Sequence, residues 1–361
     1  MSSEQLTTLA KVFALKQLPG SEIELQGEVP FDAVEPYRTE ALKHLASHLE
    51  LPGFRVGHVP ADVALKKIGE SAVLEEAVER FMRDFYPALV AEHKADVVGQ
   101  PKVQVTKLAG GNPVGLLVRA AVYPEVVLPK NWRTLGEEVR LEPVADIITD
   151  EVDNAVTSLR RARAKADAPG TDTKAEVKED DLPELDDAFA QGLGDFKNLE
   201  DLKTKIKENL KLEKEQKAKD KRRGEIIDAL LKKISIEVPA IFVESELEKI
   251  MGQLKDDVTR FSAHGRGLTF DGYLAQVGKT EEQLRGEFRG QAHKRATLQL
   301  VLNKIAEEAN IEPEEEEVKT EMGHALKHFP DARPDLLKVH IETIMRNERA
   351  FQLLEGAEEK A

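Results

Sequence analysis

The stretch Leu51-Pro-Gly-Phe-Arg-Val-Gly-His-Val-Pro60 lies between two segments whose apolar residues recur at helical spacing. Gly53 and Gly57 accept backbone angles that other residues resist, so the chain can turn tightly here. An aromatic residue, Phe54, and a cation, Arg55, stand between these glycines. The stretch therefore predicts a helix–loop–helix with an exposed tip that carries Phe54 and Arg55.

The two helices beside this loop have recognisable boundaries. Asp32 and Glu35 have the spacing of a capping box at the start of the first helix. Pro60 starts the second helix, because its fixed φ suits a first helical turn, and Gly69 interrupts that helix. The apolar residues that recur are Val34, Tyr37, Ala41, Leu45 and Leu49 in the first helix, and Val73, Ala77, Phe81, Phe85 and Leu89 in the second.

Strand patterns surround the helices. Weak alternation over residues 11–29, broken at Pro19-Gly20, predicts a β-hairpin. Two further strands are expected over 103–105 and 116–122. The order of these elements predicts an α+β domain over residues 1–125, with an antiparallel sheet and two helices packed on one of its faces.

The remainder of the chain predicts an all-α, multi-helix body. We expect residues 126–149 to form an extended connector and residues 150–361 to form the helical domain. Within that domain, residues 166–181 are rich in Ala, Asp, Thr, Lys and Glu, which predicts a flexible acidic linker. Helices are expected over 150–166, 198–234, 239–262, 280–309, 312–329 and 333–355, with prolines at several of their boundaries.

The overall composition limits the function classes. The chain has 361 residues, a formal net charge of -15 and a sequence pI of about 5.3, which argue against broad affinity for nucleic acid. The lysine-rich stretch 203–223 is interrupted by acidic residues and predicts a solvated helix face. Cysteine is absent, which excludes disulfides and thiol catalysis. Without a signal pattern or a long apolar run, we expect a cytoplasmic protein without membrane contact.

The loop resembles the ribosome-binding signature of trigger factor, the bacterial chaperone at the nascent-chain exit. That signature usually reads Gly-Phe-Arg-x-Gly-Lys-x-Pro. Weaker resemblances follow in family order at Tyr123-Pro-Glu-Val-Val-Leu-Pro129, Leu182-Pro-Glu-Leu185 and Ile236-x-Val-Pro239. The signature falls here on Gly53, Phe54, Arg55, Gly57, His58 and Pro60, and His58 replaces the lysine. The resemblance implies that Arg55 pairs with an acid of an exit-site protein or an rRNA phosphate, while Phe54 is buried against protein.

The family also has a prolyl-isomerase domain of FK506-binding type, inserted after the helix expected at 150–166. Here only about fifteen residues separate that helix from Leu182, whereas such a domain needs on the order of 90–100 residues. It also needs an aromatic-lined pocket, and residues 133–188 contain no aromatic residue. We therefore expect the isomerase domain to be absent and a tether to replace it.

Other motifs do not indicate a chemical site. His44 and His48, like His324 and His328, have i,i+4 spacing, but a zinc site needs at least three converging ligands. Gly278-Lys-Thr280 lacks the preceding glycine and strand of a phosphate loop. We expect no metal, no cofactor and no catalytic residues, and no enzymatic activity from the retained part of the family fold.

These observations predict an ATP-independent chaperone whose docking domain binds the large ribosomal subunit, through protein and rRNA, and whose helical body projects arms that shield nascent chains. The resemblance also implies a homodimer off the ribosome. Candidate client contacts are Phe242, Met251, Phe261, Met322, Phe329 and Phe351. An amphipathic helix shows the same stripe when it faces its own core. Alternatives are an active peptidyl-prolyl isomerase, a cytoplasmic helical assembly scaffold, and a periplasmic chaperone, which the missing export signal disfavours.

Overall fold

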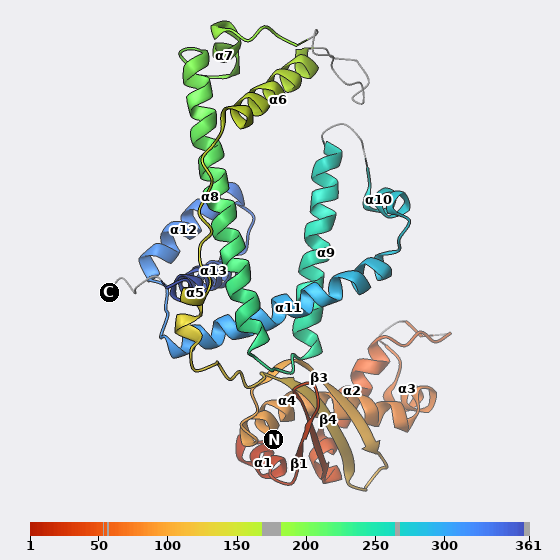
Figure 1. The fold of residues 1–361 in the computed structure, drawn as a ribbon. Helices are drawn as coiled ribbons and strands as arrows, with labels where there is room; N and C mark the ends of the chain where they lie inside the picture. Colours follow the sequence, from red (N-terminus) through yellow and green to blue (C-terminus); the bar gives the residue numbers. More distant parts are fainter. Residues whose placement is uncertain (53, 56–57, 168–181, 264–267, 357–361) are drawn as a thin grey trace. The chain divides into compact units, whose positions relative to one another are not determined.

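The computed structural model describes the chain except for residues 53, 56–57, 168–181, 264–267 and 357–361 (Figure 1). The chain forms two compact units, each built from two segments that are distant in sequence. Unit 1 comprises Met1–Val127 and Ser235–Lys304. Unit 2 comprises Leu128–Ile234 and Ile305–Ala361. The described residues are mostly helical, with a small antiparallel sheet near the N-terminus, as the sequence predicts.

The sheet belongs to unit 1. Its described strands are β1 (Ala14–Leu18), β2 (Glu22–Val29), β3 (Val97–Lys107) and β4 (Val114–Val122), arranged antiparallel in the order β1-β2-β4-β3. Successive side chains of a strand point to opposite faces. Leu25 and its cross-strand partner Val118 are therefore buried, while Glu24 and Arg119 form an ion pair on the other face. The predicted hairpin and both further strands are confirmed.

Four helices accompany the sheet in the described part of residues 1–127: α1 (Ser3–Ala10), α2 (Phe31–Ser47), α3 (Ala61–Ile68) and α4 (Glu70–Glu92). The core centres on α4, where the buried rings of Phe81 and Phe85 stack with their centroids 5.0 Å apart. Gly69 has a φ of 89° and separates α3 from α4, which confirms the predicted interruption.

The capping box predicted at Asp32 and Glu35 is wrong. Pro30 holds the N-cap position of α2, with φ -57° and ψ 143°, and no side chain caps the helix. Helix α2 therefore begins at Phe31, and Asp32 already lies in the first turn, where its negative charge favours the helix dipole. Pro60 likewise stands at the N-cap of α3, one residue before the first turn in which the sequence places it.

The second segment of unit 1 contains α9 (Ala240–Ala263), α10 (Phe270–Val277) and α11 (Glu281–Glu308), whose last residues continue into unit 2. Leu247 and Met251 of α9 pack with Leu284 and Ala292 of α11 in a shared apolar core. Predicted helices over 239–262 and 280–309 are confirmed, whereas the short α10 is an addition.

Unit 2 contains the short helices η1 (Trp132–Thr134), α5 (Leu135–Glu138) and α7 (Asp187–Leu193), and the longer helices α6 (Thr149–Asp167), α8 (Leu199–Lys232), α12 (Glu315–His328) and α13 (Pro334–Leu354). The buried Trp132 and Leu135 lie within the connector predicted over 126–149, so that stretch is not extended throughout. Most of the linker predicted over 166–181 lies outside the described residues. Its first two residues belong to α6.

The lysine-rich face of α8 is paired with acidic residues, as the sequence predicts for a solvated helix. Lys203 pairs with Asp153 and Lys214 with Glu151, both on α6. The hydrogen bond from Lys214 holds the pKa of Glu151 below its ordinary value. Among the described residues, no helix combines the length and apolar character that a membrane span requires.

Candidate functional site

The loop between α2 and α3 presents Phe54 and Arg55 to solvent. The N–H of Phe54 donates to the carbonyl of Leu51 at 3.1 Å, and the N–H of His58 donates to the carbonyl of Arg55 at 2.9 Å. Phe54 is 43% exposed, and Arg55 and His58 are exposed, while Val59 is buried and fixes the end of the loop. The exposure predicted for the tip is therefore confirmed.

The remaining signature positions are placed unequally. Gly53 and Gly57 lie outside the described residues. Pro60 is exposed and sets the start of α3. In the next turn, Ala64 is fully buried, and α3 packs against α2 and α4. The loop thus connects two helices, α2 and α3, that are both packed in the domain.

Two side-chain contacts join α2, which precedes the loop, to α4. The guanidinium of Arg38 on α2 donates to both carboxylate oxygens of Glu70, at 2.8 and 2.9 Å, and this hydrogen bond holds the pKa of Glu70 below its ordinary value. The hydroxyl of Tyr37 donates to Asp84 on α4 at 2.7 Å. Burial, followed by the Asp84 hydrogen bond, raises the pKa of Tyr37 to about 12. These contacts brace α2 against α4.

One histidine of each pair lies beside an acidic residue. Nδ1 of His44 lies 3.0 Å from Oε1 of Glu76, and its ring meets that of His48 with a centroid distance of 5.2 Å. His324 lies 3.8 Å from Glu321 of the same helix. Within the part of the chain that the structure describes, no group of three or more side chains is arranged to hold a metal ion.

Three of the predicted client contacts are engaged inside the fold. Met251 is 1% exposed in the core of α9. The half-buried ring of Phe242 faces Tyr123 at a centroid distance of 5.2 Å. Phe351 is half-buried, and the guanidinium of Arg223 lies over its ring at 4.9 Å.

The other predicted client contacts differ in exposure. Phe329, which follows α12, is 67% exposed. Met322 is half-buried on α12. The side chain of Phe261 lies outside the described part of the chain. Phe329 is therefore the most accessible of the candidates whose side chains are described, and the role of the whole set stays a prediction.

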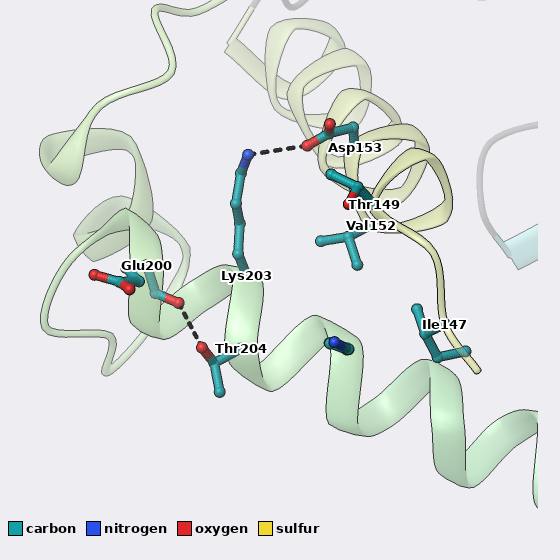
Figure 2. Close-up of a pocket in the computed structure, with 8 residues that line it drawn as sticks. Ile147, Thr149, Val152, Asp153, Glu200, Lys203 and Thr204 are labelled. Carbon is teal, nitrogen blue, oxygen red and sulfur yellow. Dashed lines mark hydrogen bonds and ion pairs between the residues drawn. The ribbon is translucent and has the colours of Figure 1, made fainter.

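A cleft of about 220 Å³ lies between α6 and α8 (Figure 2). Ile147 and Val152 supply apolar side chains at its wall. Lys203 crosses to Asp153 at 2.9 Å, and the hydroxyl of Thr204 donates to the backbone carbonyl of Glu200 at 2.9 Å (Figure 2). These contacts occupy the ammonium of Lys203, the carboxylate of Asp153 and the hydroxyl of Thr204.

Gly278-Lys-Thr280, which resembles part of a phosphate loop, instead joins two helices. Gly278 ends α10 with a left-handed φ of 67°. Thr280 and Gln283 then cap α11 reciprocally, through backbone-to-side-chain hydrogen bonds of 2.9 and 3.2 Å. The glycine and threonine are explained by helix termination and initiation.

An α+β domain with an exposed Phe–Arg loop, followed by a chain of long helices, defines a recognisable class of folding factor. The family model described as bacterial trigger factor protein matches residues 12–182, and the model of the trigger factor C-terminus matches residues 198–352. The chain therefore belongs to the trigger factor family. The two matches leave only residues 183–197 between them, and the isomerase-domain model is absent from the matches.

Individual trigger factors are similar over most of the chain. The Corynebacterium kroppenstedtii protein is 27% identical, with 84% of this chain and 74% of that protein covered. The Thermus thermophilus protein is also 27% identical, with 88% and 91% covered. The Caldicellulosiruptor bescii protein is 26% identical, with 79% and 81% covered.

A solved structure shows the same fold. It is described as promiscuous substrate recognition in folding and assembly activities of the trigger factor chaperone. It is 18% identical in sequence, covers 96% of this chain and 100% of its own, and has a TM-score of 0.51. At this identity, the likeness supports the fold alone.

Proposed function

We propose that this chain is an ATP-independent chaperone that docks at the nascent-chain exit of the large ribosomal subunit and transiently shields unfolded polypeptide. The observation that carries the proposal is the exposure of Phe54 and Arg55 on the loop that bears the family signature. Both family models match the chain in family order, which supports the same role.

The chemistry of the tip suits such a docking site. Arginine presents a planar fork of donors that matches carboxylates and phosphates. Among the described residues, Arg55 forms no ion pair, so its charge is available to a partner. Because the chain as a whole carries a charge of -15, attraction to the ribosome depends on this local cation rather than on the net charge.

Client shielding requires exposed apolar side chains on the helices. Phe329, Leu336 and Val339 are 67%, 59% and 61% exposed around the turn between α12 and α13. Complete burial of one such side chain contributes about 1.5–3 kcal/mol, and a shallow contact gains only part of that. Several weak contacts on projecting helical arms therefore allow capture with fast release and need no nucleotide cycle.

Co-sedimentation with ribosomes tests the docking site. Burying an aromatic side chain contributes about 1.5–3 kcal/mol, but Phe54 is only 43% exposed before binding, so Phe54→Ala should weaken binding about tenfold. Arg55→Ala should weaken binding as well. Val12→Ala and Arg83→Ala are matched controls, because both side chains are exposed elsewhere in the domain. Unchanged binding of both loop variants, with intact folding, would refute the docking role.

The histidine of the signature changes the charge of the loop. The signature usually carries lysine at this position, whereas this chain carries His58. Because lysine would add a second fixed cation close to Arg55, His58→Lys should strengthen ribosome binding. Equal affinity of the natural chain and this variant, measured with intact ribosomes, would contradict this component of the proposal.

A further inference from the structure

The start of α9 is attached to one end of the sheet inside unit 1. The ring of Phe242 faces that of Tyr123, which follows β4, at a centroid distance of 5.2 Å and an interplanar angle of 52°. The carboxylate of Glu237 accepts a hydrogen bond from the N–H of Gly20 at 2.5 Å, and its carbonyl accepts one from the hydroxyl of Ser21 at 2.7 Å. An aromatic contact and two directional hydrogen bonds thus meet at one place.

A third contact depends on a glycine in β3. Gly99 has a φ of 73° and lies where the pairing of β3 with β4 shifts register. A Cβ at this position would stand 2.1 Å from Cδ1 of Ile241. The positive φ favours glycine at this position, and any side chain there would have to displace the exposed end of Ile241.

All three contacts arise from the same end of the sheet. The turn between β1 and β2, the first residues of β3 and the last residues of β4 lie together there, as the pairing of Glu22 with Ala121 and of Val97 with Val122 shows. The N–H of Val122 also donates to the carbonyl of Ser21 at 2.9 Å. The residues at this end of the sheet are therefore hydrogen-bonded to one another without any contribution from α9.

We propose that Glu237, Ile241 and Phe242 form a seam with Tyr123 and Gly99 that holds α9–α11 and the α+β domain as one rigid body. Phe242 is then a positioning residue rather than a client contact. This assignment rests on the proposed function. It means that docking of the loop on the ribosome also sets the direction in which α9 faces the emerging chain.

Paired spin labels test the rigidity of the seam in the full chain. The chain contains no cysteine, so labels attach only at the cysteines that are introduced. Gln104→Cys on β3 and Asp256→Cys on α9 place labels at two exposed positions of unit 1. Pulsed electron resonance should give a single narrow distance peak. Tyr123→Ala combined with Phe242→Ala should replace that peak by a broad distribution.

Two variants separate the seam from general destabilisation. Phe242→Tyr keeps an aromatic ring and should restore the narrow peak beside the natural Tyr123. Tyr37→Ala removes a half-buried tyrosine of the same domain, away from the seam, and should leave the peak unchanged. A broad distribution in the natural chain, or a narrow peak in the double alanine variant, would overturn the proposal.

Ribosome experiments distinguish failure of the seam from failure of docking. The double alanine variant should bind ribosomes as tightly as the natural chain. In the natural chain, a cross-linker attached at Asp256→Cys should react with nascent chains of particular lengths. In the double alanine variant, this dependence on nascent-chain length should be lost. Phe54→Ala should do the opposite, with ribosome binding weakened and the distance peak retained. If the double alanine variant lowers cross-linking without broadening the peak, Phe242 is a client contact and the seam assignment is wrong.

Discussion

Replacing Arg222 should loosen unit 2 more than replacing any exposed arginine, because its guanidinium joins backbone groups from two distant segments. Nε donates to the carbonyl of Val139 at 2.9 Å, and Nη2 donates to the carbonyls of Gly136 at 2.7 Å and Glu355 at 3.1 Å. Helix α5 with the residue that follows it, and the end of α13, are therefore tied to α8 by one side chain.

The magnitude follows from the number of hydrogen bonds and from their partial burial. A hydrogen bond to a charged group contributes about 1.5–3 kcal/mol. Arg222 is half-buried, so water replaces part of what is lost. For Arg222→Met, which keeps the apolar stem, we expect a loss of about 3 kcal/mol in the free energy of unfolding of unit 2. Arg222→Lys should cause most of the same loss in the free energy of unfolding, because a single ammonium group cannot reach all three carbonyls.

The chain offers a built-in reporter for the measurement. Its lone tryptophan, Trp132, is 5% exposed in unit 2, so urea titration followed by tryptophan fluorescence reports this unit. With a slope of about 1–3 kcal/mol per molar urea, the midpoint should fall by about 1–3 M. Arg161→Met, at an exposed position on α6, is the control. If Arg222→Met shifts the midpoint no further than the control, the guanidinium does not clasp the two segments.

Three further predictions use the same kinds of measurement. Gly136→Ala should lower the urea midpoint of unit 2, because a new Cβ would stand 1.9 Å from a backbone carbonyl oxygen at the end of α13. The hydrogen bond from Arg223 holds the pKa of Glu348 below its ordinary 4.5. The pair therefore stabilises the fold fully above about pH 4.5, and this stabilisation is lost as the pH falls through the lowered pKa. Glu348→Gln should remove this contribution to the acid sensitivity of unit 2, measured by tryptophan fluorescence. Burial and the Asp84 hydrogen bond raise the pKa of Tyr37 from 10.0 to about 12, so this stabilisation is complete below pH 10 and is lost towards pH 12; Tyr37→Phe should remove a late step from the tyrosinate absorbance titration.

Local patterns explain which elements the sequence predicts. The strands over 11–29 alternate, the long helices carry apolar stripes, and prolines stand at their boundaries, so these elements agree with the structure. The short helices α1, α7 and α10 are different. A helix of one or two turns is marginal on its own and depends on capping and tertiary contact. Thr269, which caps α10 through the N–H of Gly272, is a signal that a closer reading of the sequence would find.

The exposed loop was predictable because glycines, an aromatic residue and a cation occur within one short stretch. The contacts of Arg222 and Phe242 were not, since no spacing rule relates a side chain to a partner more than 80 positions away. The client candidates show the same limit. Met251 and Phe329 have similar apolar character in sequence, yet one is 1% and the other 67% exposed. Periodicity identifies an apolar face without identifying what covers it.

The junction at which the family carries its isomerase domain is closed by local contacts in this chain. Nε of Arg160 on α6 donates at 2.7 Å to the carbonyl of Pro183, 23 positions further along. Beyond it, Phe189 and Ala190 of α7 pack on Leu202 of α8 in a small core. Both ends of the intervening segment are thus held by side chains of unit 2 itself. Domain insertions are tolerated where the chain leaves and re-enters a fold at neighbouring points. The helical packing of α6, α7 and α8 therefore requires nothing from an inserted domain.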